Sequence, residues 1–118
     1  MVSVNVDDVR RVALDLPGTT EHLIRGQVKF RVKQLVYVAF SRDETVMGFA
    51  FPKEGRVALV ESEPDKFQLP PVADLRYNWV DASLAALDVE EMTELVTDAW
   101  TMVVPKKVAR GYFDSHGG

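Results

Sequence analysis

The hydrophobic period of the chain changes from helical to strand spacing and back, and this constrains the fold more than any other feature. Apolar residues first recur at helical spacing over residues 5–16, and Pro17-Gly18 ends that segment. Residues 25–51 then alternate every two residues and are rich in Val, Phe and Tyr, which is typical of half-buried strands. Strands are expected at 28–32, 35–40 and 45–51, and the short connections at 33–34 and 41–44 favour an antiparallel meander.

The second half of the chain returns to helical spacing around one further strand. Residues 53–62 predict a short helix with Val57, Ala58 and Val60 facing inward, and Pro70-Pro71 predicts an extended crossing. A strand is expected over 79–84. The last long helix begins at Asp88, and Glu91 at its third position completes the pattern of a capping box.

This order of helix, three-stranded meander, helix, strand and helix predicts an α+β fold. Helices on one face of an antiparallel sheet form a two-layer sandwich. A chain of 118 residues is long enough to bury a core of its own, so we expect a single domain over residues 1–113. Residues 106–113 are expected to add one helical turn, and residues 114–118 to form a flexible tail.

Composition excludes several classes of function. The chain has no cysteine, which removes disulfides, thiolate nucleophiles and cysteine-ligated zinc. No apolar run reaches the roughly 18 residues of a membrane span, and the N-terminus shows no export signal, so we expect a cytoplasmic protein without a membrane partner. The net charge of −4 opposes the simplest picture of a nucleic-acid binder, although the distribution of charge matters more than the sum.

Several short motifs along nearly the whole chain resemble the YjbR/MmcQ-like family of small bacterial proteins. In order, they are Pro17-Gly18-Thr19-Thr20-Glu21, Phe30-Arg31-Val32, Pro70-Pro71, Trp79-Val80, Leu87-Asp88, Leu95-Val96 with Asp98-Ala99-Trp100, and Pro105-Lys106. The resemblance implies a sandwich of the CyaY/frataxin type. It also implies a DNA-binding label that rests on a proposed double-wing shape of the family.

The chain departs from the family pattern at three places. Lys33-Gln34 stands where the family has a glycine-rich hairpin, and Asn78 stands where it has Gly before Trp79. Asn tolerates positive φ better than most residues, so that turn can survive. Ala99-Trp100 replaces Ser-Tyr, which argues against any role that needs a hydroxyl there.

A basic stripe provides the residue-level argument for nucleic acid. Its members are Arg25, Lys29, Arg31 and Lys33, whose even spacing places them on one face if the strand runs straight. Cations in a row can contact successive phosphates of a backbone. Lys106 and Lys107 extend the patch if the C-terminal segment folds back, and we expect weak, largely sequence-independent binding. The alternative interpretation is a solvated strand face whose lysines suppress edge pairing.

A protein partner is the second functional hypothesis. If the hairpin pairs through residues 33–34, the basic stripe shares its face with Val36, Val38 and Phe40, and Met47 and Phe49 are further candidates for that face. Such a mixed face fits a homodimer or another protein contact, and a one-residue slip in register reverses the assignment.

The sequence contains no motif typical of a catalytic site or of a cofactor-binding site. His22 beside Glu21 lacks a nucleophile and an orienting group, and no glycine-rich phosphate loop is present. We therefore expect no enzyme activity and no cofactor. Carboxylates on the last long helix raise the question of metal because of the frataxin-like resemblance, but a solvated face is the better interpretation. Trp79 and Trp100 are expected to belong to the core, where they pack together or under the Pro70-Pro71 crossing.

Overall fold

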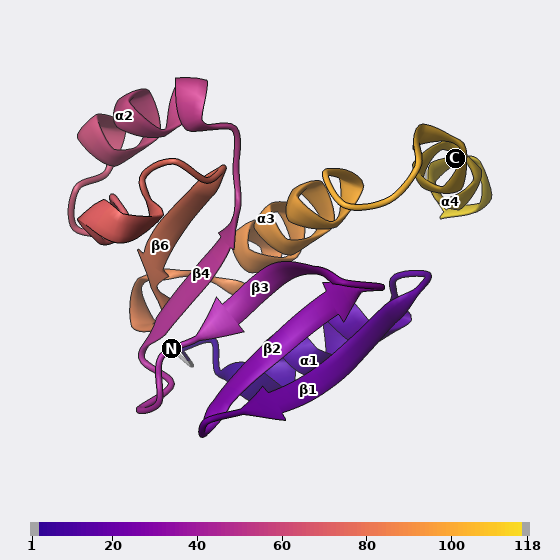
Figure 1. The fold of residues 1–118 in the computed structure, drawn as a ribbon, viewed down its shortest axis with the longest axis horizontal. Coiled ribbons are helices and arrows are strands. Elements are labelled where there is room, and N and C mark those ends of the chain that lie inside the picture. Colours follow the sequence, from indigo (N-terminus) through magenta and orange to yellow (C-terminus); the bar gives the residue numbers. More distant parts are fainter. Residues whose placement is uncertain (1–2, 117–118) are drawn as a thin grey trace.

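The computed structural model describes residues 3–116, which form four α-helices and one six-stranded antiparallel sheet (Figure 1). The helices are α1 (Val6–Asp15), α2 (Lys53–Ser62), α3 (Val89–Thr101) and α4 (Lys106–His116). The strands are β1 (Thr19–Ile24), β2 (Gln27–Val32), β3 (Leu35–Phe40), β4 (Val46–Ala50), β5 (Phe67–Gln68) and β6 (Trp79–Ser83), and the short turns η1 (Val72–Asp74) and η2 (Leu84–Ala86) flank β6.

The sheet has the strand order β1-β2-β3-β4-β6-β5 and is covered on one face only. Helices α1 and α3 lie behind β1 to β4 in Figure 1, whereas α2 lies beyond the end of β4, beside β6. The predicted α+β sandwich with helices on one face is therefore confirmed. We call the opposite face, which α1 and α3 leave uncovered, the open face.

Strand alternation decides which side chains enter the core. In β2, Val28, Phe30 and Val32 are buried, while Lys29 and Arg31 between them are only half-buried. The largest fully buried side chains are Trp100, Tyr37, Phe30, Phe40, Phe49, Phe67, Met47 and Met92. Burial of each such side chain contributes about 1.5–3 kcal/mol, so the layer between sheet and helices is the main source of stability.

A β-bulge shifts the register between β2 and β3. Phe30 pairs with Val38, but the next residue, Arg31, pairs with Val36, so Tyr37 is the extra residue on β3. Tyr37 is fully buried, with its hydroxyl 2.7 Å from Thr19 Oγ1, and burial raises its pKa to about 12 against the opposing effect of that hydrogen bond.

The bulge overturns the expected mixed face. Val38 and Phe40 lie in the core rather than beside the basic residues, and Met47 and Phe49 are buried there as well. Only Val36 of the expected apolar set stays on the side of Arg31. The reason is the one-residue insertion, which moves the side chains beyond it to the other face of the sheet.

Strand β1 is an element that the sequence analysis missed. It pairs with β2 through a two-residue turn in which Arg25 has φ 55° and Gly26 has φ 79°. Positive φ at both positions is the signature of a type I′ hairpin, and Gly26 is the residue that could have indicated it. The expected three-stranded meander is therefore the last three strands of a four-stranded one.

Helix α2 has a partly different inward face from the expected one. Val60 packs against the core, but Val57 and Ala58 are exposed, and the side chain of Arg56 is buried at 8% exposure. Its guanidinium donates to the backbone carbonyl oxygens of Tyr77 at 2.8 Å and Trp79 at 3.4 Å, and also to that of Leu75. A single charged side chain thus holds the segment that leads into β6.

Helix α3 begins as predicted, with the Asp88 carboxylate accepting from the backbone N–H of Glu91 at 2.7 Å. The Glu91 side chain does not close the expected capping box. It pairs instead with Lys66 Nζ at 2.9 Å, which ties α3 to the residue before β5.

Helix α4 is longer than the expected single turn and projects from the body of the fold (Figure 1). Its aromatic residues Tyr112 and Phe113 pack edge-on against Trp100. The helix runs to His116, so residues 114–116, expected in a flexible tail, are helical, and residues 117–118 lie outside the described part. Across residues 3–116, no helix has the length and apolar character needed to cross a membrane.

Replacing Arg56 by Leu should lower the free energy of unfolding by about 2–4 kcal/mol, because buried carbonyl oxygens lose a charged donor. Urea unfolding followed by circular dichroism measures this change. The matched control is Arg11→Leu, since Arg11 is 76% exposed and makes only a 3.7 Å ion pair. Equal losses for the two variants would show that Arg56 does not hold the segment.

Candidate nucleic-acid interface

The centre of the predicted basic stripe lies on the open face. Lys29 and Arg31 project there because Val28, Phe30 and Val32 face the helices. Within residues 3–116, neither cation forms an ion pair or hydrogen bond. Both charges are therefore available to a ligand.

Arg25 and Lys33, the outer members of the stripe, lie in the turns at the two ends of β2. Arg25 has φ 55° and Lys33 has φ 54°, so the even spacing does not continue as straight strand through these positions. Both residues are exposed. The sequence analysis missed Arg42, whose Nε donates to the carbonyl oxygen of Arg25 at 3.0 Å and adds a cation to that turn.

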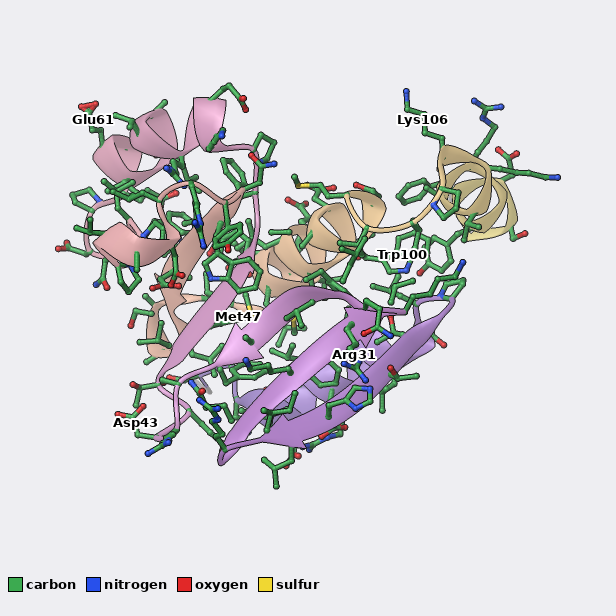
Figure 2. The ribbon with its side chains drawn as sticks, in the orientation of Figure 1. Arg31, Asp43, Met47, Glu61, Trp100 and Lys106 are labelled. Carbon is green, nitrogen blue, oxygen red and sulfur yellow. The ribbon has the colours of Figure 1, made fainter. Side chains whose placement is uncertain are left out.

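Lys106 and Lys107 stand at the exposed first turn of α4. Figure 2 shows Lys106 pointing away from the sheet, while Arg31 lies over it. The structure thus does not bring the α4 lysines into line with Lys29 and Arg31.

The side chain of Arg31 is held by packing. Its Nε is buried and has no hydrogen-bond partner within the described residues, which is uncommon for a buried donor. The two terminal guanidinium nitrogens also have no partner there. A planar fork of unpaired donors suits a phosphate oxygen pair.

Beside the two cations, the open face is hollowed into a trough of about 1140 Å³. Its floor contains a row of directly opposed residues, Lys29, Ala39, Gly48 and Asp81, contributed by four neighbouring strands. The two smallest side chains stand in the middle of this row, between a cation at one end and a carboxylate at the other. The row thus leaves space above Ala39 and Gly48, and at Gly48 the Trp79 indole fills part of that space.

Gly48 allows an aromatic side chain to lie on the sheet. A Cβ at this position would be 2.5 Å from Trp79 Nε1 and 2.9 Å from Asp81 Oδ1, closer than real Cβ contacts. Trp79 is half-buried on the open face, whereas Trp100 is fully buried in α3 and donates from Nε1 to the Pro17 carbonyl oxygen at 2.9 Å. The two tryptophans do not pack together, because alternation in β6 places Trp79 on the open face, where Pro71 lines the same trough.

Asp81 lies next to Trp79 on the same face of β6. Burial raises the pKa of this carboxyl above its usual range, the hydrogen bond from Trp79 opposes that rise, and the nearby charge of Asp74 adds to it. Within the described residues, Asp81 has no cationic partner. The trough thus holds a half-buried carboxylate that still has lone pairs to offer.

The rim of the trough adds a second aromatic ring. Tyr77 is 51% exposed, and the Arg76 guanidinium carbon lies 4.8 Å from its ring centroid. Tyr37, in contrast, is fully buried and offers no ring to a ligand. Met102 and Val103, which follow α3, line another side.

The residues considered for catalysis or metal binding do not assemble a site in the described part of the chain. Glu21 pairs with Arg10 at 2.8 Å, and His22 Nε2 lies 2.9 Å from Thr20 Oγ1. Between residues 3 and 116, no three His, Asp or Glu side chains lie close enough to hold a metal ion.

Replacing Gly48 by Ala should displace the Trp79 ring and lower the free energy of unfolding by about 1–3 kcal/mol. Urea unfolding gives the stability, and the NMR resonance of the Trp79 indole N–H reports the displacement. Gly111→Ala is the control, because nothing lies within 4 Å of its Cβ, and Ala in a helix should stabilise by up to about 1 kcal/mol. An unshifted indole resonance in Gly48→Ala would contradict the described contact.

Comparison with known proteins agrees with the fold. Uncharacterized proteins of Mycobacterium bovis and Mycobacterium tuberculosis are 32% identical to the chain over 73 residues. The match takes in 61% of this chain and 56% of each relative, so the chain spans little more than half of their length. The crystal structure of Deinococcus radiodurans protein DR2400, with the family-model domain DUF419, superposes with a TM-score of 0.73. That alignment covers 98% of this chain and 89% of the other at 18% identity, which shows a shared fold.

The family assignment rests on a further match. The YjbR family model matches residues 14–102, a range that includes the whole sheet and all of α3. The resemblance inferred from the motifs is confirmed, and the chain belongs to the YjbR family.

Proposed function

We propose that this YjbR-family domain binds nucleic acid through the open face of its sheet and does not catalyse a reaction. The observation that carries the proposal is the pair of unpaired cations, Lys29 and Arg31, beside the trough. Two residues apart on one strand, their Cα atoms are separated by about 6.6 Å, which suits contact with neighbouring phosphates.

The net charge of −4 does not oppose this proposal once position is considered. The exposed carboxylates Glu90, Glu94 and Asp98 belong to α3, which lies on the covered side of the sheet (Figure 1). Lys29 and Arg31 belong to the open side. Local potential rather than total charge determines where a polyanion binds.

The proposed absence of catalysis is supported by the engagement of the candidate groups. Glu21 is paired with Arg10, and His22 contacts a threonine hydroxyl rather than an acidic partner. A cytoplasmic location and a closer likeness to CyaY and frataxin remain predictions that accompany the proposal.

The alternative of a homodimer or other protein contact has less structural support than nucleic-acid binding. It depended on an apolar set next to the basic residues, and Val38, Phe40, Met47 and Phe49 of that set are buried in the core. Nucleic-acid binding is therefore the function that the geometry favours.

Replacing both cations, as Lys29→Glu/Arg31→Glu, should weaken binding at least about tenfold and reduce the slope of log affinity against log salt by about 2. The reason is that two phosphate contacts, each releasing counterions, are lost. Fluorescence anisotropy with a short labelled duplex and a matching single strand, titrated with salt, measures both quantities. Circular dichroism confirms that the variant is folded.

The control carries the same change of charge at a different place. Lys106→Glu/Lys107→Glu alters the first turn of α4, which points away from the sheet, so it should weaken binding much less. Two results would overturn the proposal: no binding by the unmodified protein near 50 mM salt, or an equal loss in both double variants.

A further inference from the structure

We propose that the trough holds one unpaired base of a single strand, stacked on Trp79, with an amino group of the base donating to Asp81 and a flanking phosphate contacting Lys29. This inference rests on the proposed function and adds a preference for single strands and for bases that carry an amino group. Cytosine meets that requirement, and thymine does not.

The stacking platform is built by the backbone of β4. Because Gly48 has no side chain, the Trp79 indole lies directly on that strand, with Nε1 and Cε2 over the glycine. Trp79 Nε1 and an oxygen of the Asp81 carboxylate both lie close to Gly48, where the indole N–H can donate to the carboxylate. Trp79 is half-buried and lines the trough, so part of the indole is open to a planar ligand. Every base can stack on an aromatic ring, so the platform provides affinity without choosing a sequence.

Selection among bases falls to Asp81. An ionised carboxylate only accepts hydrogen bonds, and that of Asp81 accepts from Trp79 with lone pairs remaining. The amino group at position 4 of cytosine can donate to it. In the same orientation, the carbonyl oxygen at position 4 of thymine presents lone pairs to lone pairs. The carboxylate then gains no donor besides Trp79, which is costly in a half-buried place.

Strand spacing sets the scale of the site. Lys29 and Asp81 stand at the two ends of the row through Ala39 and Gly48, three strand spacings apart, which is about 14 Å between Cα atoms. The lysine side chain reaches inward over part of that distance, and a nucleotide with its phosphate spans the remainder. A ligand that is anionic at one end, planar in the middle and a hydrogen-bond donor at the other end matches this order of groups.

The stacking site in the trough excludes paired bases. The rings of a duplex are stacked on one another and their Watson–Crick edges are occupied, so none can lie flat on Trp79. A trough of about 1140 Å³ has room for an unstacked base with its sugar. The site therefore requires a single strand.

The test compares two ten-residue oligonucleotides, oligo(dC) and oligo(dT), by fluorescence anisotropy at pH 7.5 and fixed salt. The unmodified protein should bind oligo(dC) about tenfold more tightly. Asp81→Asn keeps the size of the side chain but supplies an amide that can donate to thymine, so the preference should fall below about threefold. Equal affinities for the two oligonucleotides, or a preference that persists in Asp81→Asn, would overturn the inference.

Variants of Trp79 test the platform separately. Trp79→Leu should weaken both oligonucleotides by about tenfold or more and leave duplex binding unchanged, whereas Trp79→Phe should retain most of the affinity if stacking is the cause. The aromatic variant keeps the test decisive if the Leu variant fails to fold. Single-strand binding unaffected by Trp79→Leu in a folded protein would contradict the platform.

The proposed function and the proposed base site fail in different ways. If duplex and both oligonucleotides bind equally, and Lys29→Glu/Arg31→Glu abolishes all binding, the phosphate contacts stand and the base site is overturned. If the unmodified protein binds none of them near 50 mM salt, both the proposed function and the base site are wrong.

Discussion

One-sided burial of the sheet determines what the remaining residues can do. Phe30, Phe40 and Phe49 must face α1 and α3 to remove their rings from water. Because side chains alternate along a strand, this requirement sends Lys29, Gly48 and Asp81 to the open face. The open face thus carries the residues that do not enter the core, and strand alternation determines both sets.

The sequence predicted what depends on regular periodicity and local caps. Lys29 and Arg31 were placed correctly on the outer side of β2, because that strand is regular through Val32. Helix α1 follows its N-cap Asn5, and the side chains of Asn5 and Asp8 cap each other's backbone N–H at 3.0 Å, a purely local signal.

Three features depended on information that periodicity does not carry. The bulge at Tyr37 lies between apolar neighbours, so nothing in the two-residue pattern marks the inserted residue. Strand β1 is an edge strand with few buried side chains. Its sequence therefore lacks the clear alternation of apolar and polar residues that indicates a strand. The contact of Trp79 with Gly48 joins β6 to β4. These two strands are far apart in the sequence, because α2 and β5 lie between them. A glycine inside a strand often marks a close approach by another group, and Gly48 is the residue that could have suggested one.

The most direct test of nucleic-acid binding by the open face is an NMR titration of the ¹⁵N-labelled protein with oligo(dC). The account predicts that shifts concentrate on open-face residues of β2, β4 and β6 and on the Trp79 indole N–H, with α1 and α3 unchanged. Shifts confined to α3 or α4, or a spectrum that does not respond at low salt, would contradict it.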